Sequence, residues 1–125
     1  MIENKNIEVI ANLEEVSLEA SQSDLYKLIK NIIDNSVVYN NQNGKLIIEL
    51  TANKLSISDT GVGIAKEDLE HIFERFYRVD KARSRESSGT GLGLSIVKHI
   101  CILYGYKISV ESQIGKGSTF IIKFR

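Results

Sequence analysis

The sequence predicts an α+β fold, a two-layer α/β sandwich in which about three helices cover one face of a mixed, mostly antiparallel β-sheet. Strand-like segments lie near both ends of the chain, helix-like segments lie between them, and the last two strand-like segments flank a Gly115-Lys116-Gly117 turn. The chain has 125 residues, of which 42% are hydrophobic. This length and composition predict a single domain over residues 1–125.

The elements are predicted from apolar periodicity. Three segments have helical spacing of apolar residues and are expected to be helices: 24–39, 66–73 and 92–104. Six shorter segments are expected to be strands: 7–11, 16–20, 45–51, 54–58, 107–112 and 118–124. Ser23 or Asp24 is the expected N-cap of the first helix, because small polar side chains accept hydrogen bonds from the free N–H groups of a first turn.

Composition narrows the classes of function. The formal net charge is zero, which gives no reason to expect a nucleic acid or a membrane surface as partner. No apolar run approaches the ~20 residues of a membrane span and no signal peptide opens the chain, so we expect a cytoplasmic domain. The single cysteine, Cys101, excludes an internal disulfide and is expected to be a small core residue.

The first predicted helix carries two asparagines on one face. Asn31 and Asn35 are four positions apart, with Tyr39 one turn further, so the three side chains lie one above the other. The two amides are either surface groups or neutral oxygen ligands that face a metal–phosphate group.

A first glycine cluster follows a predicted strand. Asp59 shares the parity of Leu55 and Ile57, so its carboxylate is expected to point inward, where it needs hydrogen-bond donors. It precedes Gly61 and Gly63. Asp59 is either a turn residue that caps the next helix or a carboxylate that accepts a proton from a ligand amine, such as that of adenine.

A second glycine cluster opens the last predicted helix. Gly89, Gly91 and Gly93 occupy alternate positions directly before its apolar stripe. Such a loop can be an ordinary turn, or it can present free N–H groups and the positive end of a helix dipole to a phosphate.

In chain order, these segments resemble the ATP-binding catalytic domain of sensor histidine kinases. That domain belongs to the ATPase superfamily shared with DNA gyrase, mismatch-repair ATPases and a heat-shock chaperone, which has the Bergerat-type fold. The resemblance rests on an asparagine box, a first glycine box, a phenylalanine box and a second glycine box: residues 31–36, 59–64, 71–80 and 89–97.

The resemblance implies roles for individual residues. Asp59 would hold the adenine amine, Asn35 would ligate Mg²⁺ with help from Asn31, and Arg78 would reach the terminal phosphate of ATP. Asn31, Asn35 and Arg78 are therefore the implied catalytic residues. Other residues are implied in binding the nucleotide: Tyr39, Gly61, Gly63, Ile64, Phe76, Lys81, Gly89, Thr90, Gly91, Leu92, Gly93, Leu94 and Thr119.

The implied activity is transfer of the γ-phosphate of ATP to a histidine on a separate dimerisation domain. A response regulator is the implied downstream partner. Relatives that hydrolyse ATP carry a glutamate at the place of Asn31, and an amide cannot activate water. His71 and His99 are each followed by isoleucine and do not fit the phosphoacceptor motif. The alternatives are a nucleotide-binding regulatory module and an anti-sigma-type serine kinase. We expect this domain to be a monomer, and the full-length kinase can be membrane-anchored.

The chain departs from the family pattern in two places. Val38 stands where the family usually has a phosphate-contacting lysine. The loss of that cation should weaken triphosphate binding unless Lys81, Arg83 or Arg85, in the expected ATP lid at 79–88, compensates. The sequence Tyr104-Gly105-Tyr106 replaces a His-Gly-Gly turn, which predicts altered packing there without a change of chemistry.

Overall fold

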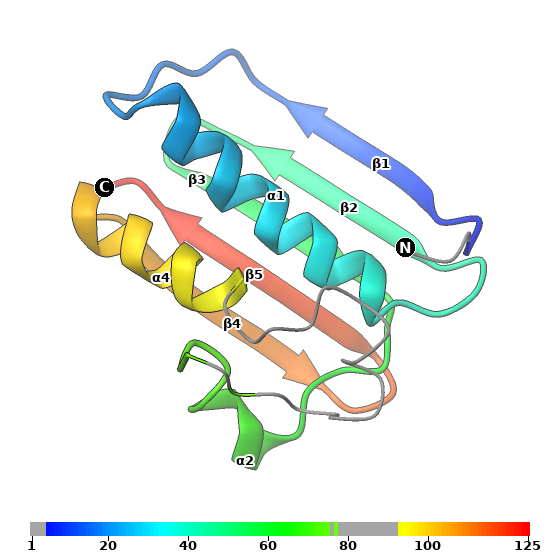
Figure 1. Cartoon of the computed structure of the whole chain (residues 1–125). Helices are drawn as coiled ribbons and strands as arrows, with labels where there is room; N and C mark the ends of the chain where they lie inside the picture. The colour runs from blue at the N-terminus through cyan, green and yellow to red at the C-terminus, as the bar shows by residue number, and fades with distance from the viewer. Residues whose placement is uncertain (1–4, 76, 78–92) are drawn as a thin grey trace.

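The computed structural model describes residues 5–75, 77 and 93–125, which form one mixed sheet and three helices (Figure 1). The strands are β1 (Glu8–Leu13), β2 (Lys45–Leu50), β3 (Lys54–Asp59), β4 (Lys107–Gln113) and β5 (Gly117–Lys123). The helices are α1 (Gln22–Val38), α2 (Lys66–Leu69) and α4 (Gly93–Tyr104). The strand order is β1-β2-β3-β5-β4, with β1 parallel to β2 and all other pairs antiparallel. The predicted fold class is confirmed.

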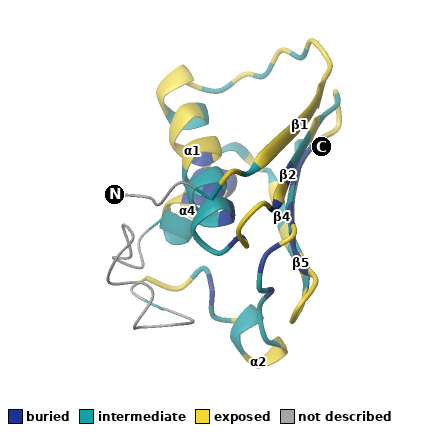
Figure 2. Cartoon of the chain, turned by 90° about the vertical axis from the view of Figure 1, so that its right-hand side faces the viewer, coloured by how far each residue is buried: buried dark blue, intermediate teal, exposed yellow. Residues whose placement is uncertain are grey.

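Helices α1 and α4 lie side by side on one face of the sheet (Figure 2). We call this the inner face. Its central strands pair Ile57 with Phe120 and Leu55 with Ile122, and all four side chains are buried. The helices add their own buried residues to this core: Leu28, Ile32, Val97, Ile100 and Cys101. Burial of these apolar side chains is the main force that holds the two layers together.

Helix α1 begins two residues earlier than predicted, because its N-cap is Ser21. The Ser21 Oγ accepts a hydrogen bond from the Asp24 N–H at 3.0 Å. Across the helix layer, the Tyr104 hydroxyl donates to Asp24 Oδ2 at 2.5 Å and accepts from the Ser21 N–H at 3.1 Å. These bonds fasten the start of α1 to the end of α4.

The strand predicted at 16–20 was wrong. Residues 14–18 have no regular structure, although Val16 and Leu18 alternate with exposed neighbours as a strand would. The backbone ladder ends where the Glu14 N–H donates to Leu50 O at 3.0 Å, and β1 is already the edge of the sheet. An alternating pattern without a neighbouring strand to pair with cannot form a ladder.

The remaining helices differ from prediction only at their ends. Helix α2 stops at Leu69. Helix α4 ends at a glycine in the left-handed region: Gly105 has φ +73°, and the Tyr106 N–H donates to Cys101 O at 2.8 Å, as in a Schellman cap. At this turn Tyr104 and Tyr106 stack with ring centroids 5.8 Å apart. Within the described residues, no helix is long and apolar enough to cross a membrane.

Candidate functional site

Asp59 lies at the end of β3 and points to the inner face, as predicted. Its side chain is 8% exposed, and Oδ1 accepts the Gly61 N–H at 2.9 Å. Burial raises the pKa of Asp59, while the backbone N–H groups of Gly61 and Ser118 and the Ser36 hydroxyl act in the opposite direction. Asp59 is a buried carboxylate at the last residue of β3. Burying a carboxylate is costly, and buried carboxylates with a perturbed pKa are typical of binding groups.

Ser36 is a site residue that the sequence analysis missed. It follows Leu28 and Ile32 at four-residue spacing on the buried side of α1, and none of its surface is exposed. Its hydroxyl lies close enough to Asp59 to lower the pKa of that carboxyl, yet Oγ makes no aligned hydrogen bond within the described residues. A buried hydroxyl whose neighbouring acceptor is poorly aligned leaves part of its hydrogen-bonding capacity unused. Together with Asp59, it can receive a polar ligand group.

The last strand brings Ser118, and not Thr119, to Asp59. The register pairs Asp59 with Ser118 and Ser58 with Thr119. Thr119 therefore lies on the outer face, where its hydroxyl is 3.0 Å from that of Ser58, because neighbouring residues of a strand face opposite ways. Ser118 is 7% exposed and its hydroxyl is 2.7 Å from that of Ser112.

The first glycine box packs tightly against two neighbouring segments. A Cβ at Gly61 would lie 2.1 Å from Tyr39 O, and one at Gly63, whose φ is +77°, would lie 2.2 Å from Gln113 O. The Ile64 N–H donates to Ser112 Oγ at 2.7 Å. These glycines thus permit close approach of backbone to backbone. The approach of Gly63 to a base, which the resemblance implies, remains a prediction.

The asparagine face of α1 meets the start of α4. Asn31 Nδ2 donates to Lys27 O at 2.7 Å, and a Cβ at Gly93 would lie 3.1 Å from Asn31 Oδ1. Within the described residues, the Asn35 side chain forms no hydrogen bond and is half-buried. The structure therefore brings the asparagine box and the end of the second glycine box together.

The loop after α1 supports the first glycine box. Tyr39 O accepts the Val62 N–H at 3.0 Å. Asn40, which is 1% exposed, accepts the Thr60 hydroxyl at 3.1 Å. The nearby Asn41 side chain donates to Thr60 O at 2.9 Å. Any movement of this loop would consequently move residues 60–62.

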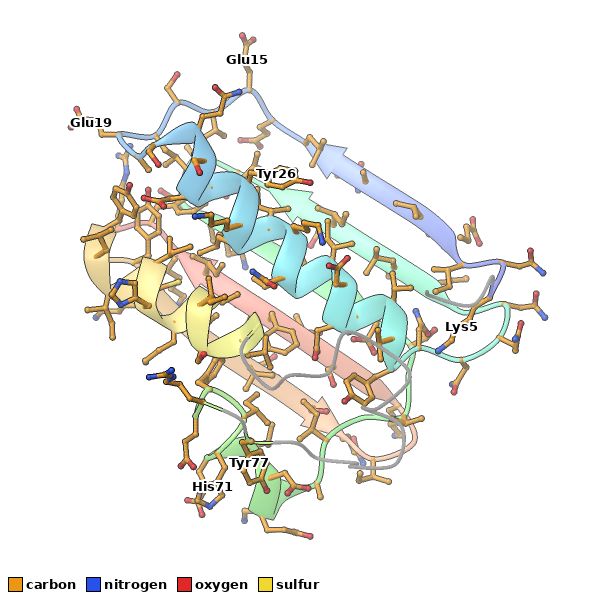
Figure 3. All side chains as sticks on the ribbon, viewed as in Figure 1. Lys5, Glu15, Glu19, Tyr26, His71 and Tyr77 are labelled. Atoms are coloured by element: carbon orange, nitrogen blue, oxygen red, sulfur yellow. The ribbon has the colours of Figure 1, made fainter. Side chains whose placement is uncertain are left out.

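The phenylalanine box begins beside the core. The Phe73 ring packs edge-on against Phe120 with centroids 6.4 Å apart, so Phe73 fills the core. His71 stacks on Tyr77 (Figure 3). The hydrogen bond that the His71 ring donates to the Glu74 carboxylate raises the pKa of His71. The hydrogen bond that the Tyr77 hydroxyl donates to Asp68 raises the pKa of Tyr77 to about 12.

Several predicted residues cannot be placed. Ile64 and Leu94 are described, and both pack against the core. The following predicted residues lie outside the described residues: Phe76, Arg78, Lys81, Arg83, Arg85, Gly89, Thr90, Gly91 and Leu92. A depression at the opposite end of the sheet, lined by Leu13, Glu49 and Lys54 among others, contains none of the predicted site residues.

The amide oxygens on the asparagine face of α1 fit a hard cation that also binds phosphate. Amide oxygens such as Asn31 Oδ1 are neutral ligands, and Mg²⁺ usually keeps several waters and takes further ligands from phosphate groups. Within the described part of the chain, no cluster of three or more His, Cys, Asp or Glu side chains could hold a metal. The metal ligands that the resemblance implies, Asn31 and Asn35, stay a prediction.

Known proteins resemble this chain over most of its length. The model of the histidine kinase-, DNA gyrase B- and HSP90-like ATPase family matches residues 20–125. The sensor histidine kinase RppB of Synechocystis sp. is 44% identical over 113 residues, which are 87% of this chain and 25% of that protein. The sensor histidine kinase WalK of Bacillus subtilis is 39% identical over 127 residues, which are 95% of this chain and 21% of that protein. The chain spans a quarter or less of the length of these relatives.

Solved structures share the fold. The mycobacterial sensor histidine kinase MprB superposes with a TM-score of 0.82 at 26% identity, covering 94% of this chain and 82% of that chain. Full-length ShkA, in complex with AMPPNP, superposes with a TM-score of 0.79 at 26% identity, covering 95% of this chain and 25% of that chain.

Proposed function

This chain belongs to the histidine kinase-, DNA gyrase B- and HSP90-like ATPase family, and we propose that it binds Mg-ATP and donates the γ-phosphate to a histidine on a separate dimerisation domain. One observation carries the proposal. Asp59 is buried beside the Ser36 hydroxyl, which has no aligned partner within the described residues, so this pair has hydrogen-bonding capacity that a polar ligand group can use.

The adenine base supplies what this pair lacks. Its exocyclic amine donates to the Asp59 carboxylate, and the Ser36 hydroxyl can donate to or accept from the base or a water beside it. Ser118 borders Asp59 from the next strand and closes the site on that side. A guanine carbonyl in place of the amine would face the carboxylate as a second acceptor, which favours adenine over guanine.

The phosphates extend from there toward the asparagine face. Asn35, assisted by Asn31, would hold Mg²⁺, which when bound would offset the negative charge of the phosphates. Gly93 lies against Asn31, which supports a path for the phosphates beneath the second glycine box. Arg78 would stabilise charge on the terminal phosphate during transfer.

The chemistry follows from positioning. A nitrogen of the acceptor imidazole attacks the γ-phosphorus in line, the bond from phosphorus to the bridging oxygen breaks, and ADP departs with that electron pair. The other ring nitrogen gives up its proton, which the acidic residue beside the acceptor histidine would accept. Asn31 cannot remove a proton from water, which favours transfer over hydrolysis. The phosphohistidine would then supply a response regulator.

The test combines this chain with a histidine-containing dimerisation domain and γ-labelled ATP. Acid-labile phosphohistidine that is absent with Asp59→Asn supports the proposal. AMPPNP binding without transfer to any tested acceptor indicates the regulatory module. Acid-stable phosphoserine on a partner indicates the anti-sigma-type kinase, and steady phosphate release from the chain alone indicates a hydrolase.

A further inference from the structure

Lys5 caps the C-terminal end of α1 from a distant part of the sequence. Its ammonium donates to Val38 O at 2.6 Å, Asn40 O at 3.0 Å and Val37 O at 3.3 Å, and Figure 3 shows Lys5 beside this end of the helix. The last turn of α1 contains no basic residue. Lys5 therefore supplies the positive charge that the terminal carbonyls of a helix favour.

Backbone bonds fix the same corner. The Asn43 N–H donates to Lys5 O at 2.7 Å, and the Glu8 N–H donates to Gly44 O at 2.9 Å. Residues 5–8 and 37–44 are thus joined by hydrogen bonds from the Lys5 side chain and by main-chain hydrogen bonds at Lys5 and Glu8, and they form one packed unit.

This unit supports the candidate nucleotide site. Tyr39 O, between the carbonyls that Lys5 binds, accepts the Val62 N–H at 3.0 Å, and Gly61 lies directly against it. The Gly61 N–H in turn holds Asp59 Oδ1 at 2.9 Å. The Lys5 ammonium is therefore connected to the Asp59 carboxylate through two pieces of backbone, the end of α1 at residues 37–40 and the glycine box at Gly61.

We propose that Lys5 is a positioning residue for nucleotide binding, which joins the N-terminal segment of the chain to the loop that holds the first glycine box. The inference rests on the proposed function. An ammonium has three N–H donors, and three carbonyls accept from Lys5. Lys5 therefore acts on the site through the backbone and does not replace the phosphate-contacting lysine that is missing at Val38.

The coupling has a thermodynamic consequence. If the Lys5 cap favours the arrangement that binds nucleotide, nucleotide must favour the cap by the same factor. Nucleotide occupancy then changes how firmly residues 5–8 are held, and a partner domain that pulls on this segment changes nucleotide affinity.

The experiment compares three variants of the chain by calorimetry with Mg-AMPPNP and by amide hydrogen exchange. Lys5→Met removes the donors and keeps the aliphatic stem, while Lys5→Arg keeps several donors. Tyr104→Phe is the matched control, because it removes the bonds to Asp24 and Ser21 at the other end of α1. We expect Lys5→Met to weaken AMPPNP binding about five- to tenfold, at the lower end of typical couplings, Lys5→Arg to restore most of it, and Tyr104→Phe to leave it unchanged.

Hydrogen exchange provides the second measurement. AMPPNP should slow exchange at residues 5–8 as well as 37–44 in the unchanged chain, and at 37–44 alone in Lys5→Met. Equal AMPPNP affinity in Lys5→Met and the unchanged chain overturns the inference and leaves the proposed function standing. An equal loss of affinity in Tyr104→Phe also overturns it, since the effect would then be one of general stability. Failure of the unchanged chain to bind AMPPNP overturns the proposed function and this inference together.

Discussion

Replacing Asp59 with asparagine should separate folding stability from nucleotide binding. The carboxyl is 8% exposed and burial raises its pKa above the ordinary value of 3.8. The unfolded chain thus loses this proton at lower pH than the folded chain, so the stability associated with Asp59 is present below pH 3.8 and is lost as the pH rises through the folded-state pKa. At neutral pH the charge opposes folding, and removing it should not lower the free energy of unfolding.

The structure also sets the size of the effect on binding. In Asp59→Asn, Oδ1 can still accept the Gly61 N–H, and the new amide can donate to the Ser36 hydroxyl, which has no aligned partner within the described residues. The adenine amine would then meet a donor in place of an acceptor. Leaving a polar group unpaired in this way costs about 1–3 kcal/mol, which corresponds to an approximately 5- to 150-fold loss of ATP affinity.

Two measurements check the prediction. Urea unfolding gives the free energy of unfolding, and calorimetry with Mg-AMPPNP gives the affinity. Glu49→Gln, which removes an exposed carboxylate from β2, is the control for loss of charge. Wild-type affinity in Asp59→Asn would refute the assignment of Asp59 to the site. A large loss of stability would instead show that Asp59 is a structural residue.

Three further predictions concern substitutions at individual positions. Ser36→Ala removes a buried hydroxyl that has no aligned partner within the described residues. Thermal unfolding should therefore show unchanged or higher stability, while calorimetry should show AMPPNP affinity lowered by about three- to tenfold. Unchanged affinity would exclude Ser36 from nucleotide binding. The carboxylates around His71 raise its pKa above 6.5, so its contribution to stability should be complete below pH 6.5 and disappear as the pH rises through the folded-state pKa; a His71→Gln chain with the same dependence of Tm on pH would contradict this. A Cβ added at Gly63 meets both a positive φ and backbone at 2.2 Å, whereas one added at Gly105 meets a positive φ alone. Urea unfolding should therefore show that Gly105→Ala lowers the free energy of unfolding by ~1 kcal/mol and that Gly63→Ala lowers it clearly more. Equal losses would show that the close approach at Gly63 has no cost.

The placement of several candidate site residues was predictable because it depends on local periodicity. The parity of Leu55 and Ile57 placed Asp59 on the buried face, and the four-residue spacing placed Asn31 and Asn35 on one side of the helix. Both follow from geometry within a single element. The same reasoning applied to the last strand would have selected Ser118, because it shares the parity of Phe120 and Ile122, whereas Thr119 was taken from the resemblance.

The features that were missed depend on contacts between distant segments. The strand at 16–20 has the right pattern but no partner strand, which only the topology reveals. Ser36 is an ordinary serine in the sequence and becomes notable only when β3 places Asp59 opposite it. Lys5 caps α1 across more than thirty residues of chain, and nothing in the periodicity of either segment indicates that they meet.

The position of β1 has a consequence for how the domain comes apart. All six of its residues are exposed, including Val9 at 59% and Leu13 at 63%, so hydrophobic burial contributes little to holding it. Beyond the anchor at residues 5–8, the strand is attached chiefly along one side, by its ladder to β2. The family match begins at residue 20, after the strand has ended. Under tension or mild denaturant, β1 should peel away as a separate cooperative unit while the remaining sheet stays folded. Force applied at the N-terminal side of β1 would then act on this strand before it acts on the rest of the described sheet.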